Sequence, residues 1–114
     1  VPFSPVAAED IPAEADGLYL GGGFPEDCAP ELSRSPRLPL LARLAERGLP
    51  IYAECGGLMY MTEAVTDFEG NTYPMVGIVP ATCEMQQSLQ RVGYVSATMR
   101  QTARPGLCAG HGAE

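Results

Sequence analysis

The chain has 114 residues, of which 46% are hydrophobic, so it can build the core of one globular domain but not of two. Its formal net charge of −7, with only 7 Lys and Arg residues, argues against nucleic-acid or anionic-membrane partners, which require a basic patch. No run approaches the roughly 20 apolar residues of a membrane span, and the N-terminus lacks a secretory-signal pattern, so we expect a cytoplasmic protein.

The first predicted elements are a strand, a glycine-rich turn and a helix. Residues 16–20 form a short buried strand that runs directly into the turn at residues 21–26. Residues 30–47 carry apolar side chains at helical spacing, interrupted early by proline and stopped at Gly48. We therefore expect the helix to begin after Pro36.

The order of strand, turn and helix occurs a second time in the chain. Residues 49–54 form the second predicted strand, Cys55 begins a tight turn, and residues 58–64 are good helix formers. Further along, we expect a polar turn at residues 67–71 and strands at residues 75–79 and 91–99. Strands that alternate with helices predict an α/β fold with parallel strands at its centre, whose carboxyl ends carry the site.

Four cysteines are spread along the chain without a CxxC pair. They are Cys28, Cys55, Cys83 and Cys108. This spacing indicates neither a zinc site nor a dense disulfide framework, so we expect no metal.

Cys55 is the candidate nucleophile. Ala53 lies two residues before it and Gly57 two residues after it, which is the cysteine counterpart of the G-x-S-x-G elbow. Its place at a helix N-terminus favours thiolate and is expected to lower the pKa of the thiol, while the amide of Gly56 is aimed above the sulfur as an oxyanion donor. The alternative is a buried small residue at a tight turn, but such a residue does not need two following glycines.

The turn at residues 21–26, with the sequence GGGFPE, has three interpretations. A phosphate cradle is disfavoured because the Lys-Ser/Thr ending of a Walker loop is absent. An amide of Gly22 or Gly23 could instead supply the second oxyanion donor, which suits the paired position of the two turns. A plain tight turn is the remaining alternative.

Two long motifs resemble a known family. Residues 19–26 (YLGGGFPE) and 51–60 (IYAECGGLMY) are similar to the C-terminal glutaminase domain of cobyrinic or hydrogenobyrinic acid a,c-diamide synthases, which are class I amidotransferases with a cysteine nucleophile. The resemblance runs from about Phe3 to Gly106. It implies a flavodoxin-like α/β domain with a mostly parallel sheet, formed by residues 1–106 and incomplete at its C-terminus, followed by a loosely held tail at residues 107–114.

The resemblance also implies a reaction. Cys55 would attack the side-chain amide of L-glutamine, with Gly56 and either Gly22 or Gly23 as oxyanion donors. The ammonia would serve the ATP-dependent amidation of the corrin carboxylates a and c in cobalamin biosynthesis. ATP, Mg²⁺ and the corrin would bind a separate N-terminal synthetase domain. No GxxxxGK[ST] motif occurs here, so we expect no cofactor in this chain.

The catalytic base is not accounted for. The family carries its catalytic histidine after a Gly-His-Glu-Phe-His-like segment, and His111, the only histidine here, resembles the non-catalytic one that precedes it. His111 is thus a weak candidate for the base, the alternative being a solvated tail residue.

Without this base, we expect the chain to be a fragment that is inactive by itself. A catalytically silent interaction module of this fold is the main competing hypothesis, and a cysteine-based redox protein of related fold is disfavoured by the GGGFPE motif.

Overall fold

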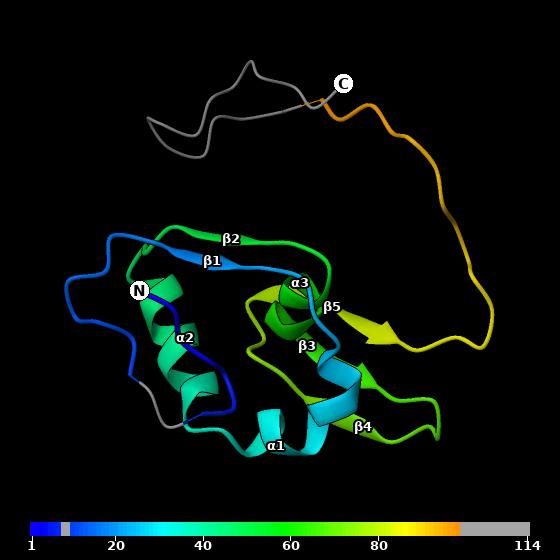
Figure 1. The fold of residues 1–114 in the computed structure, drawn as a ribbon, viewed down its shortest axis with the longest axis horizontal. Helices are drawn as coiled ribbons and strands as arrows, with labels where there is room; N and C mark the ends of the chain where they lie inside the picture. The colour runs from blue at the N-terminus through cyan, green and yellow to red at the C-terminus, as the bar shows by residue number, and fades with distance from the viewer. Residues whose placement is uncertain (8–9, 99–114) are drawn as a thin grey trace.

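The computed structural model describes residues 1–7 and 10–98 as a mixed α/β domain (Figure 1). Its elements are β1 (Leu18–Leu20), a 3-10 helix η1 (Pro25–Cys28), α1 (Ala29–Arg34), α2 (Arg37–Glu46), β2 (Ile51–Ala53), α3 (Gly56–Met61), β3 (Thr62–Thr66), β4 (Thr72–Pro74) and β5 (Val79–Glu84). Within this described part, no helix has the length and apolar character needed to cross a membrane.

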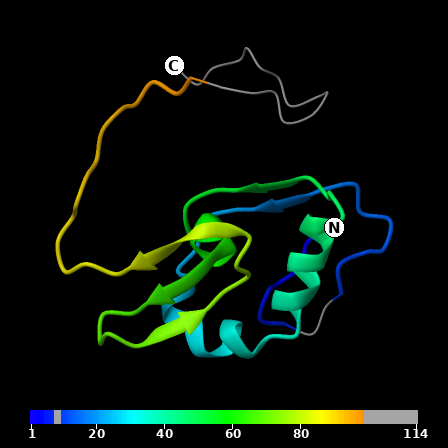
Figure 2. The same ribbon diagram turned by 180° about the vertical axis from the view of Figure 1, so that it is seen from behind.

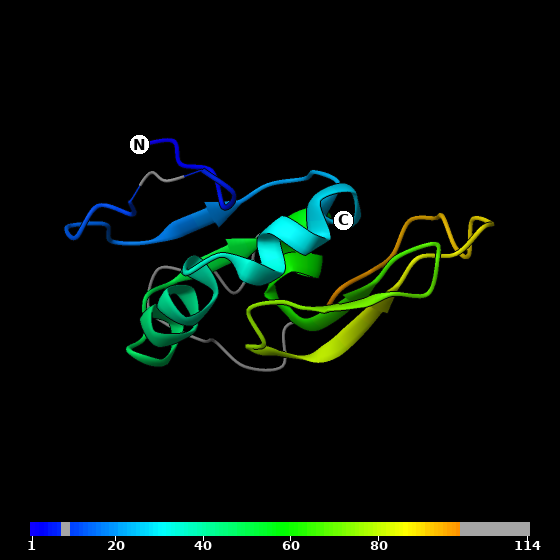
Figure 3. The ribbon, with the colours of Figure 1, turned by 90° about the horizontal axis from the view of Figure 1, so that it is seen from below.

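The strands form two short sheets. β1 and β2 are parallel, with Leu18 opposite Ile51 and Leu20 opposite Ala53. The second sheet has the order β4-β3-β5, in which β3 is antiparallel to β4 and parallel to β5. α3 lies between the two sheets (Figure 3). The predicted parallel pairing of the first two strands is confirmed, whereas the expected mostly parallel sheet is seen only as this pair and a mixed sheet.

The hydrophobic core lies where the helices meet β3. Leu41 of α2, Met61 of α3 and Val65 of β3 are the largest fully buried side chains. Tyr60 is also buried, and loss of hydration raises the pKa of its hydroxyl to about 12. Two consecutive residues of α3 are therefore held in the core, which fixes the helix and the turn from which it starts.

The boundaries of α2 confirm the predicted ones. The helix begins after Pro36, and Gly48, just beyond its end, has a φ of 90° that favours glycine. The residues before it form a separate helix, α1, which the helical spacing did not distinguish. The two helices separate at Ser35, whose extended backbone is the conformation that a following proline imposes.

The prediction of a helix over residues 58–64 is wrong at its C-terminal end. α3 stops at Met61, and β3 begins at Thr62. Amide N–H groups of residues 76–78 donate to the carbonyls of Tyr60, Met61 and Thr62 over 2.8 to 3.1 Å. These bonds satisfy the last carbonyls of α3 from outside, so a further helical turn is not needed there.

Two strand predictions also differ from the structure. Met75 and Val76 are buried but lie outside any strand, and β5 runs over Val79–Glu84 instead of residues 75–79. Residues 91–98 form no strand, although their side chains alternate; they are exposed and extend away from the domain (Figure 2). Alternation makes a strand only where a neighbouring strand supplies hydrogen bonds, and no described strand lies beside this segment.

The predicted polar turn at residues 67–71 is confirmed by the hydrogen bond from the Asp67 amide to the Asn71 carbonyl.

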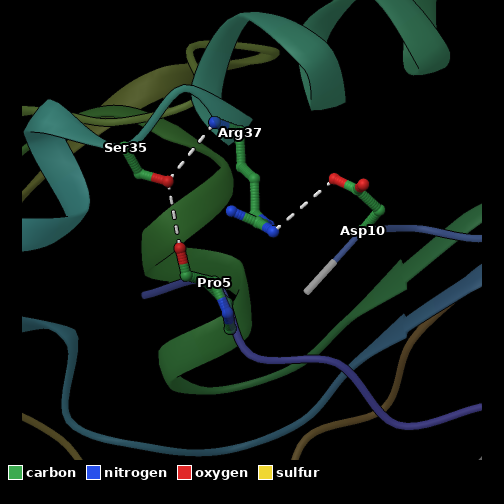
Figure 4. A network of polar contacts seen from close by, with 4 residues as sticks. All are labelled: Pro5, Asp10, Ser35 and Arg37. Atoms are coloured by element: carbon green, nitrogen blue, oxygen red, sulfur yellow. Dashed lines mark hydrogen bonds and ion pairs between the residues drawn. The ribbon is translucent and has the colours of Figure 1, made fainter. Parts of the chain in front are cut away.

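Polar contacts hold the N-terminal segment against α2 (Figure 4). The hydroxyl of Ser35 donates to the carbonyl oxygen of Pro5 over 3.0 Å and accepts from the amide of Arg37 at 3.3 Å. The guanidinium of Arg37, which is only 7% exposed, lies 3.9 Å from the Asp10 carboxylate. Ser35 is thus shared between the start of α2 and the N-terminal segment.

Replacing Ser35 with alanine should lower the free energy of unfolding by about 1 kcal/mol, because one hydroxyl serves two backbone groups. Urea unfolding, monitored by circular dichroism, would measure this loss of unfolding free energy. Ser33→Ala is the matched control, since the Ser33 hydroxyl bonds only the Pro30 carbonyl near the start of its own helix. Equal losses in the two variants would contradict a special role for Ser35.

Candidate active site

Cys55 occupies a strained turn between β2 and α3. Its φ of 52° and ψ of −120° make it the only non-glycine residue with positive φ in the described part of the chain. Such a conformation costs on the order of 1 to 3 kcal/mol and is typical of a nucleophile elbow. The predicted strand, turn and helix are all present around Cys55. The cysteine is exposed, so the alternative of a buried small residue does not hold.

Backbone hydrogen bonds from the glycine-rich turn hold this elbow. The amide of Glu54 donates to the carbonyl of Leu20 over 3.0 Å. The amide of Gly57 donates both to the carbonyl of Gly21 at 3.0 Å and to that of Glu54 at 2.9 Å. The residues on either side of Cys55 are therefore tied to the end of β1, which holds the strained residue in place.

The two glycines after Cys55 are required by a close approach of two backbones. A Cβ atom on Gly56 would lie 2.3 Å from the carbonyl oxygen of Gly23, and one on Gly57 would lie 2.3 Å from that of Leu20. Both distances are far inside van der Waals contact. No other amino acid fits at either position unless the two turns move apart.

The glycine-rich turn also lies beside the thiol. A Cβ atom on Gly22 would be 4.0 Å from the Sγ atom of Cys55. No hydrogen bond among the described residues uses the amides of Gly22, Gly23 or Gly56. The structure thus brings together all the predicted site residues except His111, which lies outside the described residues, as does Cys108.

A pair of tyrosines next to the elbow was not predicted from the sequence. Tyr19 and Tyr52 face each other across β1 and β2 and stack with ring centroids 5.4 Å apart and planes 6° from parallel. The Tyr19 hydroxyl donates to the carboxylate of Glu54, and this bond raises the pKa of Tyr19. The only sequence signal was that each tyrosine is the middle residue of a short strand, which does not reveal its partner.

A cavity of about 740 Å³ borders this region, and Tyr19, Gly22 and Gly56 are among the residues that line it. It is bordered by the N-terminal segment, the glycine-rich turn and Tyr60, and Cys55 does not line it.

The described cysteines, Cys28, Cys55 and Cys83, are free thiols. Across residues 1–7 and 10–98, no group of three or more His, Cys, Asp or Glu side chains could hold a metal ion.

The sequence of the chain is similar to those of known proteins. The model of the CobB/CobQ-like glutamine amidotransferase domain matches residues 1–111. Cobyrinate a,c-diamide synthases from Dehalococcoides mccartyi and Caldanaerobacter subterraneus are each 48% identical to the chain over 99 and 98 residues, or 86% and 85% of its length. The Synechococcus enzyme of that name is 47% identical over 108 residues, or 90% of the chain. The matches cover only 21%, 22% and 23% of these relatives. No solved structure matches significantly.

The close approach of the two turns leads to a test. Gly56→Ala should lower the free energy of unfolding by about 2 kcal/mol and slow the alkylation of Cys55, because the added methyl group would meet the Gly23 backbone. Gly23→Ala is the matched control, since nothing lies within 4 Å of a Cβ atom there. Thermal unfolding and alkylation rates would be compared. Wild-type behaviour of Gly56→Ala would refute the described contact.

Proposed function

Because the chain belongs to the CobB/CobQ-like glutamine amidotransferase domain family, we propose that it carries the site at which L-glutamine is hydrolysed to glutamate and ammonia. The observation that carries this proposal is the exposed thiol of Cys55 in a strained turn, beside the backbone of Gly22. An exposed nucleophile flanked by unengaged amides is the arrangement that acyl transfer requires.

In the proposed reaction, the thiolate of Cys55 attacks the side-chain amide carbon of glutamine. The resulting oxyanion accepts hydrogen bonds from the Gly56 amide and from that of Gly22 or Gly23. The carbon–nitrogen bond then breaks, the nitrogen leaves as ammonia after gaining a proton, and a glutamyl thioester remains. Water hydrolyses the thioester through a second oxyanion at the same position. Each oxyanion donor in such a site is worth about 3 to 4 kcal/mol of transition-state stabilisation.

The ammonia has a proposed destination. The chain spans about a fifth of the length of the relatives it matches, which are named cobyrinate a,c-diamide synthases. The ammonia would amidate the corrin carboxylates a and c in cobalamin biosynthesis. The chain has no Walker-type loop, so ATP, Mg²⁺ and the corrin are assigned to a separate synthetase domain.

The proposal also extends to the arrangement of the chain. Residues 1–106 would form the amidotransferase domain and residues 107–114 a tail. β1 and β2 would be part of a larger flavodoxin-like sheet, since ligands in such folds bind at the carboxyl ends of parallel strands, where both turns lie.

A chloroketone analogue of glutamine should alkylate Cys55 before the other thiols, because Cys55 is the only cysteine in the described part of the chain that combines exposure with adjacent amide donors. Mass spectrometry of partially labelled protein would measure the order. Cys55→Ser is the control that should abolish the fast phase. Labelling spread equally over Cys28, Cys83 and Cys108 would refute the proposed glutamine site.

The 114-residue chain alone should hydrolyse glutamine about a thousandfold more slowly, or worse, than the same chain extended by the histidine-bearing segment typical of the family. The reason is that a thiol nucleophile needs a base to take its proton and to protonate the departing ammonia. Glutamate release would be assayed for both proteins and for His111→Ala. If the 114-residue chain and the extended chain hydrolyse glutamine at equal rates, and His111→Ala abolishes this activity, His111 is instead the base. Absence of activity in both would favour the silent interaction module.

A further inference from the structure

The carboxylate of Glu54 has no part in the chemistry above, yet it belongs to the residue before the proposed nucleophile. Its residue directly precedes Cys55, so the two Cα atoms are about 3.8 Å apart. The hydroxyl of Tyr19 donates to Oε1 of Glu54. Within the described residues, no other hydrogen bond and no Lys or Arg side chain engages this carboxylate. Its negative charge and its Oε2 atom are therefore available to a ligand.

Tyr19 links the carboxylate to the thiol through the glycine-rich turn. A Cβ atom on Gly21 would lie 3.4 Å from Cε1 of Tyr19, and the next residue, Gly22, lies beside Sγ of Cys55. The stacked ring of Tyr52 supports Tyr19 from the neighbouring strand. The Tyr19 ring thus contacts both the Glu54 carboxylate and the glycine-rich turn that carries the amide donors, at the carboxyl ends of β1 and β2.

We propose that Glu54, oriented by Tyr19, binds the α-ammonium group of the glutamine substrate and so selects an α-amino acid for the site. This inference rests on the proposed glutaminase function. A carboxylate and an ammonium group form a charge-assisted hydrogen bond, and the exposed faces of the two tyrosines favour a cation further. The side chain of glutamine separates its amide from its ammonium group by a few bonds, which suits a carboxylate on the residue next to the nucleophile.

The test uses two chloroketones of equal length. One is the analogue of glutamine with its α-amino group, and the other lacks only that group. The ratio of their rates of alkylation at Cys55 reports recognition of the ammonium group, because any change in thiol reactivity affects both reagents equally. The wild-type chain should prefer the amino reagent, and Glu54→Gln should reduce this preference about tenfold.

Two further variants separate binding from structure. Tyr19→Phe keeps the stacked ring but removes the hydroxyl, so it should reduce the preference less than Glu54→Gln does, without changing the rate with the reagent that lacks the amino group. Glu46→Gln, which removes an exposed carboxylate at the end of α2, should leave the preference unchanged.

The outcomes distinguish this inference from the proposed function. If Cys55 is alkylated first but shows no preference for the amino reagent, or keeps its preference in Glu54→Gln, the inference is overturned and the glutaminase proposal stands. If Glu54→Gln slows both reagents equally, Glu54 only shapes the elbow, which also overturns the inference. If Cys55 is not the favoured thiol for either reagent, the glutamine site itself is wrong.

Discussion

The contact between two glycine-containing backbones is the constraint on which the rest of this site depends. Gly56 and Gly57 approach the turn after β1 so closely that a single methyl group at either position would meet a carbonyl oxygen at 2.3 Å. Because the contact involves backbone atoms, it cannot be relieved by a change of side-chain rotamer. The contact fixes the distance between the amides of the glycine-rich turn and the thiol of Cys55. That distance decides whether the amides and the thiol can act on the same substrate.

The elbow in turn depends on the packing of α3. A helix of six residues does not form by itself in water, and β1 and β2 have only three residues each. α3 persists because Tyr60 and Met61 are buried in the core and because residues 76–78 bond its last carbonyls. The position of Cys55 is therefore determined by contacts at the opposite end of the helix.

The sequence predicted best those features that one or two residues decide locally. The limits of α2 follow from Pro36 and Gly48, and the elbow follows from the spacing of small residues around Cys55. The meeting of the two turns was predictable because both follow strands of a parallel pair. The end of α3 at Met61, the start of β5 at Val79 and the lack of a strand over residues 91–98 depend on partners distant in sequence. The same is true of Tyr19 and Tyr52, whose stacking needs the register of two strands.

The positive φ of Cys55 has an evolutionary consequence. At this position glycine would adopt the same backbone without strain, so the cysteine keeps the fold less stable than it needs to be. Selection for stability alone would remove the thiol, and a gene duplicate released from its chemical task would drift toward glycine here. The proposed use of the sulfur would therefore have to outweigh the stability that a glycine at this position would add.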